Sequence, residues 1–150
     1  VDQIAALLSE YELAPEQLQL ELTESILMSE VSGASERVRA LGDMGVRIAV
    51  DDFGTGYSSL SYLKDLPVDE LKIDRSFVQG VAFDQNKAAI AQAIIRMGQS
   101  LELRVLAEGV DDLDAVQFLK DNGCDGAQGY HYSKPITAQK FARKFLAQQH

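Results

Sequence analysis

Four short runs of strand-forming residues are separated by helical segments in this chain, and each run ends in charged side chains. The runs lie at 18–24, 46–52, 71–74 and 105–109. A strand that is buried on both faces reads as a near-continuous apolar run, and parallel sheets are where such strands occur. The pattern therefore predicts a parallel sheet whose strands carry their charged residues at one end.

These charged residues are expected to meet at one edge of the sheet, because parallel strands all end on the same side. They are Glu21, Asp51, Asp52, Lys72 and Glu108. This is the edge at which α/β barrels build their active sites. Charges at the ends of successive strands favour an active site over a set of solvated loop residues, and the excess of carboxylates indicates a site that binds metal ions.

The rest of the pattern predicts five strand-helix units after a first helix. The expected strands are 17–23, 46–52, 70–74, 104–109 and 126–131. The expected helices are 1–13, 29–44, a short one ending near Lys64, 86–101, 112–121 and 137–148, with Gly45 and Thr137 as caps. Such alternation implies parallel pairing, in a doubly wound sheet or in a barrel. Charged residues at the ends of at least four strands favour a (β/α)8 barrel.

The chain is long enough for only part of such a barrel. A closed barrel has eight strands and about 250 residues, whereas this chain has 150 residues and five predicted strands. We therefore expect residues 1–150 to form the C-terminal part of a single barrel domain, about its last five strand-helix units. The first residue is Val1 rather than Met, which also suggests a piece of a longer protein.

The charge and composition exclude several classes of function. A net charge of −9 argues against a binding surface for nucleic acid polymers. No apolar run reaches the roughly 20 residues that span a bilayer, so we expect no membrane segment in this chain. The single Cys124 excludes an intrachain disulfide and makes a zinc-thiolate site improbable. A reducing, cytoplasmic setting is expected.

The Asp51-Asp52 doublet indicates a particular metal chemistry. One carboxylate can bridge two cations while its neighbour turns to the second, which gives the closely spaced metal pair used for displacement at phosphodiesters. Magnesium prefers carboxylate and water oxygens, with substrate phosphates completing its shell. Lys72 could orient a water molecule or neutralise charge that develops on the phosphoryl group.

Several segments together resemble the EAL domain family, the phosphodiesterases that linearise cyclic di-GMP. The segments are 21–25, 51–60, 71–74, 107–110 and 128–130, in the family's order and spacing. The resemblance covers essentially all 150 residues, and the Asp-Asp-Phe-Gly-Thr-Gly segment is highly specific. It implies a TIM-like barrel that hydrolyses cyclic di-GMP to linear pGpG with two Mg²⁺ or Mn²⁺ ions, in bacterial second-messenger signalling.

The resemblance also implies roles for the charged residues at the strand ends. Glu21 matches a ligand of the first metal, and Asp51 matches the carboxylate that bridges both metals. Asp52 and Glu108 match ligands on the side of the second metal, and Glu108 also counts among the catalytic residues. Lys72 matches the lysine that positions the attacking water.

Four further positions are assigned by the same resemblance. Gln128 matches a polar residue of the substrate pocket, and Asp74 and Asp111 fall at positions that line this pocket. The family more often has glutamate where Asp111 stands. Glu24 matches a glutamate that holds the loop after Asp52, a loop linked in this family to metal binding and to a homodimer.

The Glu-Ala-Leu motif for which the family is named does not occur in this chain. Its glutamate is a metal ligand in the family, and a further asparagine ligand lies on the next strand. Glu12-Leu13-Ala14 is no substitute, because it lies in the turn before the strand that carries Glu21. The missing segments correspond to the first strands of the barrel, and their loss is expected to weaken the first metal site.

The sequence leaves two alternatives to a phosphodiesterase. One is a non-catalytic module that binds cyclic di-GMP or regulates a partner, a role that suits a truncated chain in particular. The other is proton abstraction beside a carbonyl with a metal-stabilised enediolate, since carboxylates and a lysine at barrel strand ends also suit that chemistry. The Asp-Asp doublet and the glycine-rich loop after it fit phosphodiester chemistry better.

Overall fold

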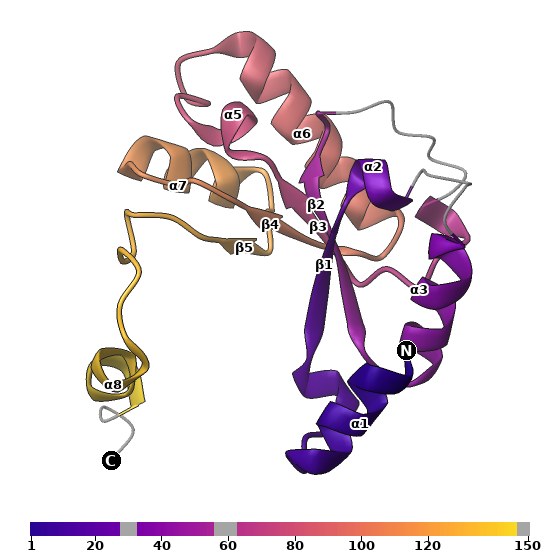
Figure 1. Cartoon of the computed structure of the whole chain (residues 1–150). Coiled ribbons are helices and arrows are strands. Elements are labelled where there is room, and N and C mark those ends of the chain that lie inside the picture. Colours follow the sequence, from indigo (N-terminus) through magenta and orange to yellow (C-terminus); the bar gives the residue numbers. More distant parts are fainter. Residues whose placement is uncertain (28–32, 56–62, 147–150) are drawn as a thin grey trace.

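The computed structural model describes residues 1–27, 33–55 and 63–146, and Figure 1 shows their arrangement. The elements before the third strand are α1 (Asp2–Glu10), the 3-10 turn η1 (Pro15–Gln17), β1 (Gln19–Thr23), α2 (Glu24–Leu27), α3 (Ala34–Asp43) and β2 (Arg47–Phe53). The remaining elements are β3 (Glu70–Ile73), α5 (Arg75–Val78), α6 (Gln85–Ser100), β4 (Arg104–Ala107), α7 (Leu113–Asp121), β5 (Gly126–Ala127), α8 (Ala138–Phe141) and a π-helical turn (Ala142–Leu146).

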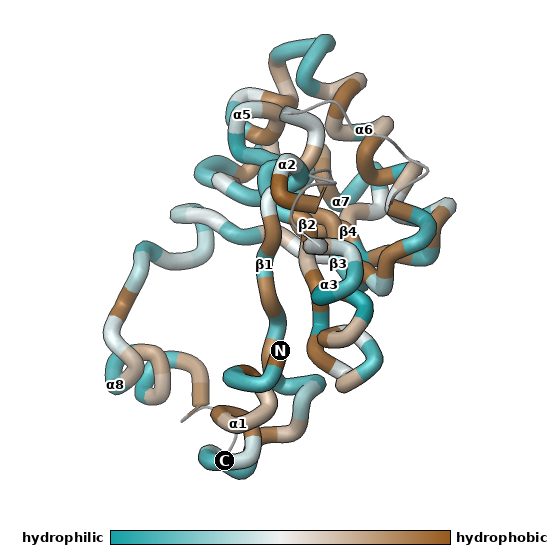
Figure 2. The backbone as a smooth tube through the Cα atoms, turned by 45° about the vertical axis from the view of Figure 1, so that its right-hand side comes forward, coloured by the Kyte–Doolittle hydropathy of each residue, from teal (hydrophilic) through white to brown (hydrophobic). Residues whose placement is uncertain are grey.

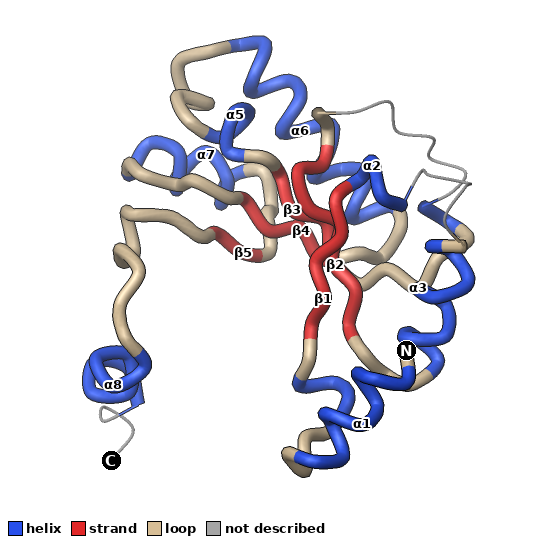
Figure 3. Tube along the Cα trace, in the orientation of Figure 1, coloured by secondary structure: helices blue, strands red, loops and turns tan. Residues whose placement is uncertain are grey.

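The five strands form one parallel sheet in the order β1-β2-β3-β4-β5, so each strand pairs with the next strand in the sequence (Figure 3). A doubly wound sheet instead reverses its strand order at a switch point. A sheet that grows in one direction through helical crossovers is the arrangement of a barrel segment. The predicted fold class, part of a (β/α)8 barrel, is confirmed.

The two faces of the sheet differ in polarity, because successive side chains of a strand point to opposite faces. One face carries apolar side chains that pack with α3, α6 and α7 in a single buried core; its strand residues are Ile48, Val50, Leu71, Ile73, Val105 and Ala107. Figure 2 shows these strands in brown. Burying each such side chain contributes roughly 1.5–3 kcal/mol, which fixes the register of the strands.

The opposite face is polar, and it carries the charged residues. In register, Ala49 lies between Glu21 and Glu70, and Thr23 lies beside Asp51. Near the start of the strands, Gln19 Nε2 donates a hydrogen bond to Glu70 Oε1 at 3.0 Å. The strands therefore alternate in polarity, rather than being apolar on both faces as their sequence suggested.

Local capping explains where several helices begin and end. Asp84 accepts hydrogen bonds from the backbone of Asn86 and Lys87 at the start of α6, and Asp112 accepts one from Ala115 N at the start of α7. Such N-caps contribute about 1 kcal/mol each. Gly45 follows α3 with a φ of 91°, a conformation that only glycine adopts easily. None of the helices in the described ranges is long and apolar enough to cross a membrane.

Some predicted elements were wrong. The strand expected at 126–131 is only Gly126–Ala127, because the chain turns after it, with Tyr132 N donating to Gly129 O at 3.1 Å. The short helices α2 and α5 were not predicted. The final helix begins after its Thr137 cap as predicted, but it widens into a π-helical turn after Phe141. Residues 29–32 of one predicted helix, residues 56–62 and residues 147–148 lie outside the described residues.

Candidate active site

Lys72 is the centre of a cluster of charges at the C-terminal edge of the sheet. Its Nζ lies 2.7 Å from Glu21 Oε2, 3.2 Å from Asp51 Oδ1 and 2.7 Å from Glu108 Oε1. These residues come from β1, β2, β3 and the residue that follows β4. The structure therefore brings together four of the five charged residues at the predicted edge.

Lys72 is 3% exposed, and its three carboxylate partners are half-buried or partly exposed. Burial alone would lower the pKa of Lys72, but the hydrogen bonds that it donates to Glu108 and Glu21, together with the nearby Asp51, hold the pKa well above its ordinary value. Lys72 therefore stays protonated at neutral pH. In this state it can donate hydrogen bonds and stabilise negative charge.

A bulge at the end of β2 separates the two residues of the Asp51-Asp52 doublet. The pairing of β2 with β3 shifts between Val50 and Phe53, so that β2 has one residue more than β3 over this stretch. Asp52 has a φ of 53°, in the left-handed region, which aspartate tolerates better than most residues. Bulges next to active sites re-aim side chains, and here the Asp51 side chain reaches Lys72.

Asp52 turns instead toward Asp74, the residue that caps the start of α5. The pKa of Asp52 is raised by burial first and then by the negative charges of Asp51 and Asp74. Burial would raise the pKa of Asp74 as well, but hydrogen bonds from Ser76 outweigh it, and the pKa of Asp74 lies below its ordinary value. Asp74 Oδ1 accepts from Ser76 N at 3.0 Å and also from the Ser76 hydroxyl. The two neighbouring carboxyl groups therefore differ, with the pKa of Asp52 raised and the pKa of Asp74 lowered.

Glu24 lies at the start of α2, beneath the segment that follows Asp52. It is 3% exposed, and its Oε2 accepts a hydrogen bond from Gly54 N at 3.2 Å. Gly54 has a φ of 97°, which favours glycine. The resemblance assigned Glu24 the role of holding the loop after Asp52. Residues 56–62, which follow Thr55 in this region, lie outside the described part of the chain.

A hollow of about 280 Å³ opens beside Glu108. Its lining includes Asp111 and Gln128, two of the three residues assigned to substrate binding. The third, Asp74, is next to Arg75, which also lines the hollow. The structure therefore places a polar cavity next to the charged cluster, on the side of β4 and β5.

Three residues of this hollow were missed by the sequence analysis: Arg75, Gln79 and Tyr130. Arg75 is the first residue of the short helix α5, and Gln79 follows its last residue. In the sequence, the only sign of this helix is Asp74, which comes directly after β3 and caps the helix. Tyr130 follows the glycine at 129. Only the position of these residues just after strand ends could have identified them.

The donor atoms of the cluster suit a divalent cation. Asp51 Oδ1 is buried and has no hydrogen-bond partner of good geometry within the described residues, although Lys72 Nζ is 3.2 Å away. Hard cations such as Mg²⁺ and Mn²⁺ prefer carboxylate oxygens of this kind. No group of three or more His, Cys, Asp or Glu side chains in the described ranges is already drawn together as a metal cage, because the acids are arranged around Lys72.

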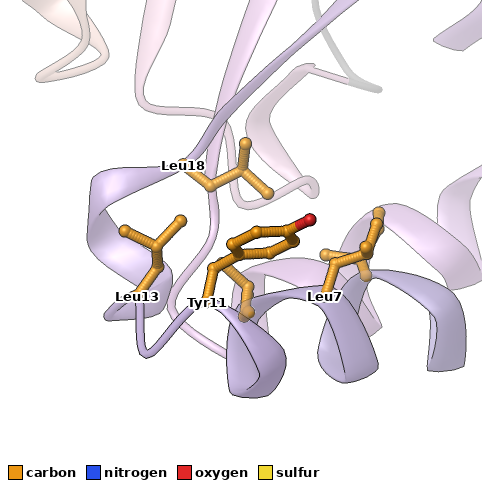
Figure 4. A pocket seen from close by; sticks show the side chains of 6 residues that line it. Leu7, Tyr11, Leu13 and Leu18 are labelled. Atoms are coloured by element: carbon orange, nitrogen blue, oxygen red, sulfur yellow. The ribbon is translucent and has the colours of Figure 1, made fainter.

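A second hollow, of about 210 Å³, is entirely apolar and lies far from this chemistry (Figure 4). Leu7 of α1 and Tyr11, which follows α1, lie near Leu13 and Leu18 around this hollow, and Leu18 precedes β1. It is therefore at the N-terminal end of the strands, whereas the charged cluster is at the C-terminal end. It offers no polar group for catalysis.

Comparisons with known proteins identify a family whose relatives resemble this chain. A family model described as the EAL domain matches residues 1–135. The chain is 45% identical over 148 residues to the cyclic di-GMP phosphodiesterase NbdA of Pseudomonas aeruginosa, covering 97% of this chain and 19% of that protein. The chain spans about a fifth of the length of the curated relatives that it matches first.

Solved structures agree with the fold and the family. The PaMucR phosphodiesterase in complex with c-di-GMP superimposes with a TM-score of 0.89 at 43% identity, covering 93% of this chain and 57% of that one. BlrP1 of Klebsiella pneumoniae, in a complex with manganese and cyclic di-GMP, superimposes with a TM-score of 0.82 at 31% identity, covering 90% of this chain and 34% of that one.

Proposed function

This chain belongs to the EAL domain family, and from that premise we propose that it carries most of the active site of a metal-dependent phosphodiesterase. The proposed reaction is the hydrolysis of cyclic di-GMP to linear pGpG, in bacterial second-messenger signalling. Water adds to one phosphorus atom, and the 3′-oxygen leaves with a proton. The names of the relatives support this activity.

The observation that carries the proposal is the position of Lys72. Its buried ammonium group lies within 3.2 Å of carboxylates from Glu21, Asp51 and Glu108. One positive and three negative charges leave an excess of negative charge that attracts cations, and a protonated lysine remains among them. This combination suits a reaction in which a phosphate anion must be bound beside cations.

The residues of the chain have distinct parts in the proposed mechanism. Glu21, Asp51, Asp52 and Glu108 would hold the metal ions through their carboxylate oxygens. When bound, divalent cations supply Lewis-acid charge that stabilises phosphate oxygens and activates water. Lys72 donates hydrogen bonds that orient the water and stabilises the charge that develops on the phosphoryl group.

The specific metal is part of the proposal. A manganese complex of a related protein and the carboxylate donors of this site both support a divalent cation, and we assign Mg²⁺ or Mn²⁺. Among the described residues, the buried Asp51 Oδ1 has no well-aligned hydrogen-bond donor and only the Lys72 ammonium nearby, so it is the atom that a cation would satisfy first.

The substrate is expected to extend from the charged cluster into the hollow beside Glu108. Gln128 and Asp111 line this hollow, and Asp74 stands at its border next to Arg75. Residues 1–150 are proposed to be the C-terminal part of one barrel domain in a cytoplasmic protein. A homodimer formed through the loop after Asp52 also belongs to the proposal, with Glu24 holding the start of that loop.

The experiment is turnover of cyclic di-GMP with Mg²⁺ or Mn²⁺, with pGpG resolved by chromatography. Three proteins are compared: the wild-type chain, Glu108→Ala, and Glu36→Ala as a matched control, because Glu36 is an exposed glutamate on α3. Turnover that survives in Glu36→Ala and disappears in Glu108→Ala supports the proposal.

A folded but inactive chain is tested again after fusion to the upstream segment of a homologous EAL domain, which supplies the Glu-Ala-Leu strand. Activity of the fusion that depends on Glu108 supports an enzyme. Cyclic di-GMP binding without turnover in either protein overturns the enzyme assignment in favour of a binding module.

A further inference from the structure

Asp111 has both of its carboxylate oxygens occupied by protein donors. Its Oδ2 accepts a hydrogen bond from Gln79 Nε2 at 3.1 Å, and its Oδ1 accepts one from Tyr130 N at 3.2 Å. Gln79 follows α5, whereas Tyr130 follows β5, so this one side chain connects the segments after three different strands. All three residues line the hollow beside Glu108.

We propose that Gln79 and Asp111 form a strut that sets the shape of this hollow, and that Asp111 is a positioning residue rather than one that binds the substrate through its charge. The consequence for ligand binding rests on the proposed function. The strut would hold the 128–130 segment, and with it Gln128, at a fixed distance from α5 and Arg75.

The contacts around Asp111 show why a single side chain can have this effect. The segments after β4 and β5 are already joined by backbone hydrogen bonds, from Val110 N to Gln128 O and from His131 N to Val110 O, both at 3.0 Å. Between them, Gly129 packs so closely that a Cβ there would lie 2.1 Å from Val110 O. These two segments therefore move as one unit.

The segment after β3 also contacts this unit. Gly109 packs against Arg75, where a Cβ on the glycine would lie 2.5 Å from Arg75 Cβ. Beyond that contact, the hydrogen bond between Gln79 and Asp111 spans the mouth of the hollow. Gln79 is itself anchored from the other side, because Lys87 Nζ donates to Gln79 O at 2.8 Å. The strut thus connects the segment that contains α5 to the segments that follow β4 and β5.

The chemistry of amides gives a sharp test. In Asp111→Asn, the side-chain oxygen can still accept from Tyr130 N, and its amide group can donate to Gln79 once the Gln79 amide turns over. The strut is kept while the negative charge is lost. Gln79→Glu instead sets two carboxylates against each other and breaks the strut, and adding Asp111→Asn to it restores a donor and an acceptor.

Two measurements are made on the 150-residue chain: exchange of the Tyr130 backbone amide by NMR without ligand, and the Kd for cyclic di-GMP by calorimetry. Asp111→Ala, Gln79→Ala and Gln79→Glu are expected to weaken binding about 2- to 10-fold, the range of one hydrogen bond, and the loss of the acceptor in Asp111→Ala should speed Tyr130 exchange. Asp111→Asn and the Gln79→Glu/Asp111→Asn double variant should stay within about twofold of wild type.

The strut is overturned if Asp111→Asn binds as weakly as Asp111→Ala while Tyr130 exchange stays slow, since the charge of Asp111 would then contact the ligand. It is also overturned if Asp111→Ala leaves Tyr130 exchange unchanged. A wild-type chain that does not bind cyclic di-GMP contradicts the proposed function. The strut is then tested by Tyr130 exchange in Gln79→Ala and Gln79→Glu, which should be faster than in wild type if Gln79 holds Asp111 and the 128–130 segment in place.

Discussion

Lys72 Nζ and Glu108 Oε1 lie 2.7 Å apart, although the two residues are not opposite each other in the sheet. Lys72 pairs with Leu106, and Glu108 follows two residues later, beyond the end of β4. The long lysine side chain reaches along the polar face to the strand end. A buried residue in the middle of a strand thereby joins the charges of the C-terminal edge.

The charge of Lys72 makes a prediction about pH. Lys72→Met leaves three carboxylates without their shared ammonium group. We expect the free energy of unfolding at pH 7 to fall by about 1–3 kcal/mol, which is less than for a fully buried cluster because the carboxylates are partly exposed to solvent. Because the pKa of Lys72 is raised in the folded chain, its contribution is fully present below the pKa of an unfolded lysine, about 10.4.

Above that pH the unfolded chain loses the proton first, so rising pH favours unfolding. The difference in stability between wild type and Lys72→Met should therefore be constant from about pH 7 to 9 and shrink above about pH 10.4. Urea unfolding at each pH measures it, with Lys140→Met on α8 as the control. A difference that does not change at high pH would contradict the ion-pair cluster.

The buried Asp51 Oδ1, which has no well-aligned hydrogen-bond donor in the part of the chain that the structure describes, predicts stabilisation by cations. Mg²⁺ or Mn²⁺ at 100 times its Kd should raise the free energy of unfolding by about 2.7 kcal/mol, and Asp51→Asn should lose most of this gain. Asp43→Asn, which changes an exposed aspartate at the end of α3, should keep it. Thermal unfolding with and without metal is the measurement, and equal gains in all three proteins would place the cation elsewhere.

Glu24 is predicted to hold the segment that follows Asp52. Glu24→Ala leaves the partly buried Gly54 N without its acceptor, and we expect this to cost about 1 kcal/mol, the low end of the range for a buried unsatisfied donor. Hydrogen exchange of the Gly54 amide should accelerate in Glu24→Ala more than in Glu24→Gln, whose side-chain oxygen can still accept. Unchanged exchange of Gly54 in Glu24→Ala would show that another group holds this segment.

Gly129 is predicted to tolerate no side chain. In Gly129→Ala the new Cβ would lie 2.1 Å from Val110 O and 2.3 Å from Val110 N, so the ends of β4 and β5 must separate. We expect a loss of more than about 3 kcal/mol. Gly80→Ala is the comparison, because Gly80 has a φ of 73° but open space around it, and backbone strain alone costs about 1–2 kcal/mol. A loss at Gly129 no larger than the loss at Gly80 in urea unfolding would contradict the close packing of Gly129 against Val110.

Cys124 is predicted to react slowly. Burial raises the pKa of its thiol, and its Sγ lies 3.3 Å from the carbonyl oxygens of Val105 and Gly126. The thiolate is the reactive form, so modification by a thiol reagent at pH 7.5 should be at least about tenfold slower than in the chain unfolded in urea. A rate equal to that of the unfolded chain would contradict the buried position.

Much of the fold and the family could be predicted from the sequence. The runs of apolar residues indicated parallel strands, the charges at their ends indicated one functional edge, and the family match confirms the resemblance. The extents of β5 and of the helices were less certain, because a two-residue strand such as Gly126–Ala127 has no periodicity of its own and depends on pairing with β4.

The sequence by itself determined which residues occupy the strand ends, since the spacing of apolar and charged residues follows from strand and helix periods alone. Only the tertiary structure decided which of those side chains contact one another. The bulge turns Asp51 toward Lys72 and Asp52 toward Asp74, and Gln79 meets Asp111 across 32 positions of sequence. Periodicity is a local property of the chain, whereas these contacts depend on backbone geometry and register between distant segments, which exist only once the sheet has formed.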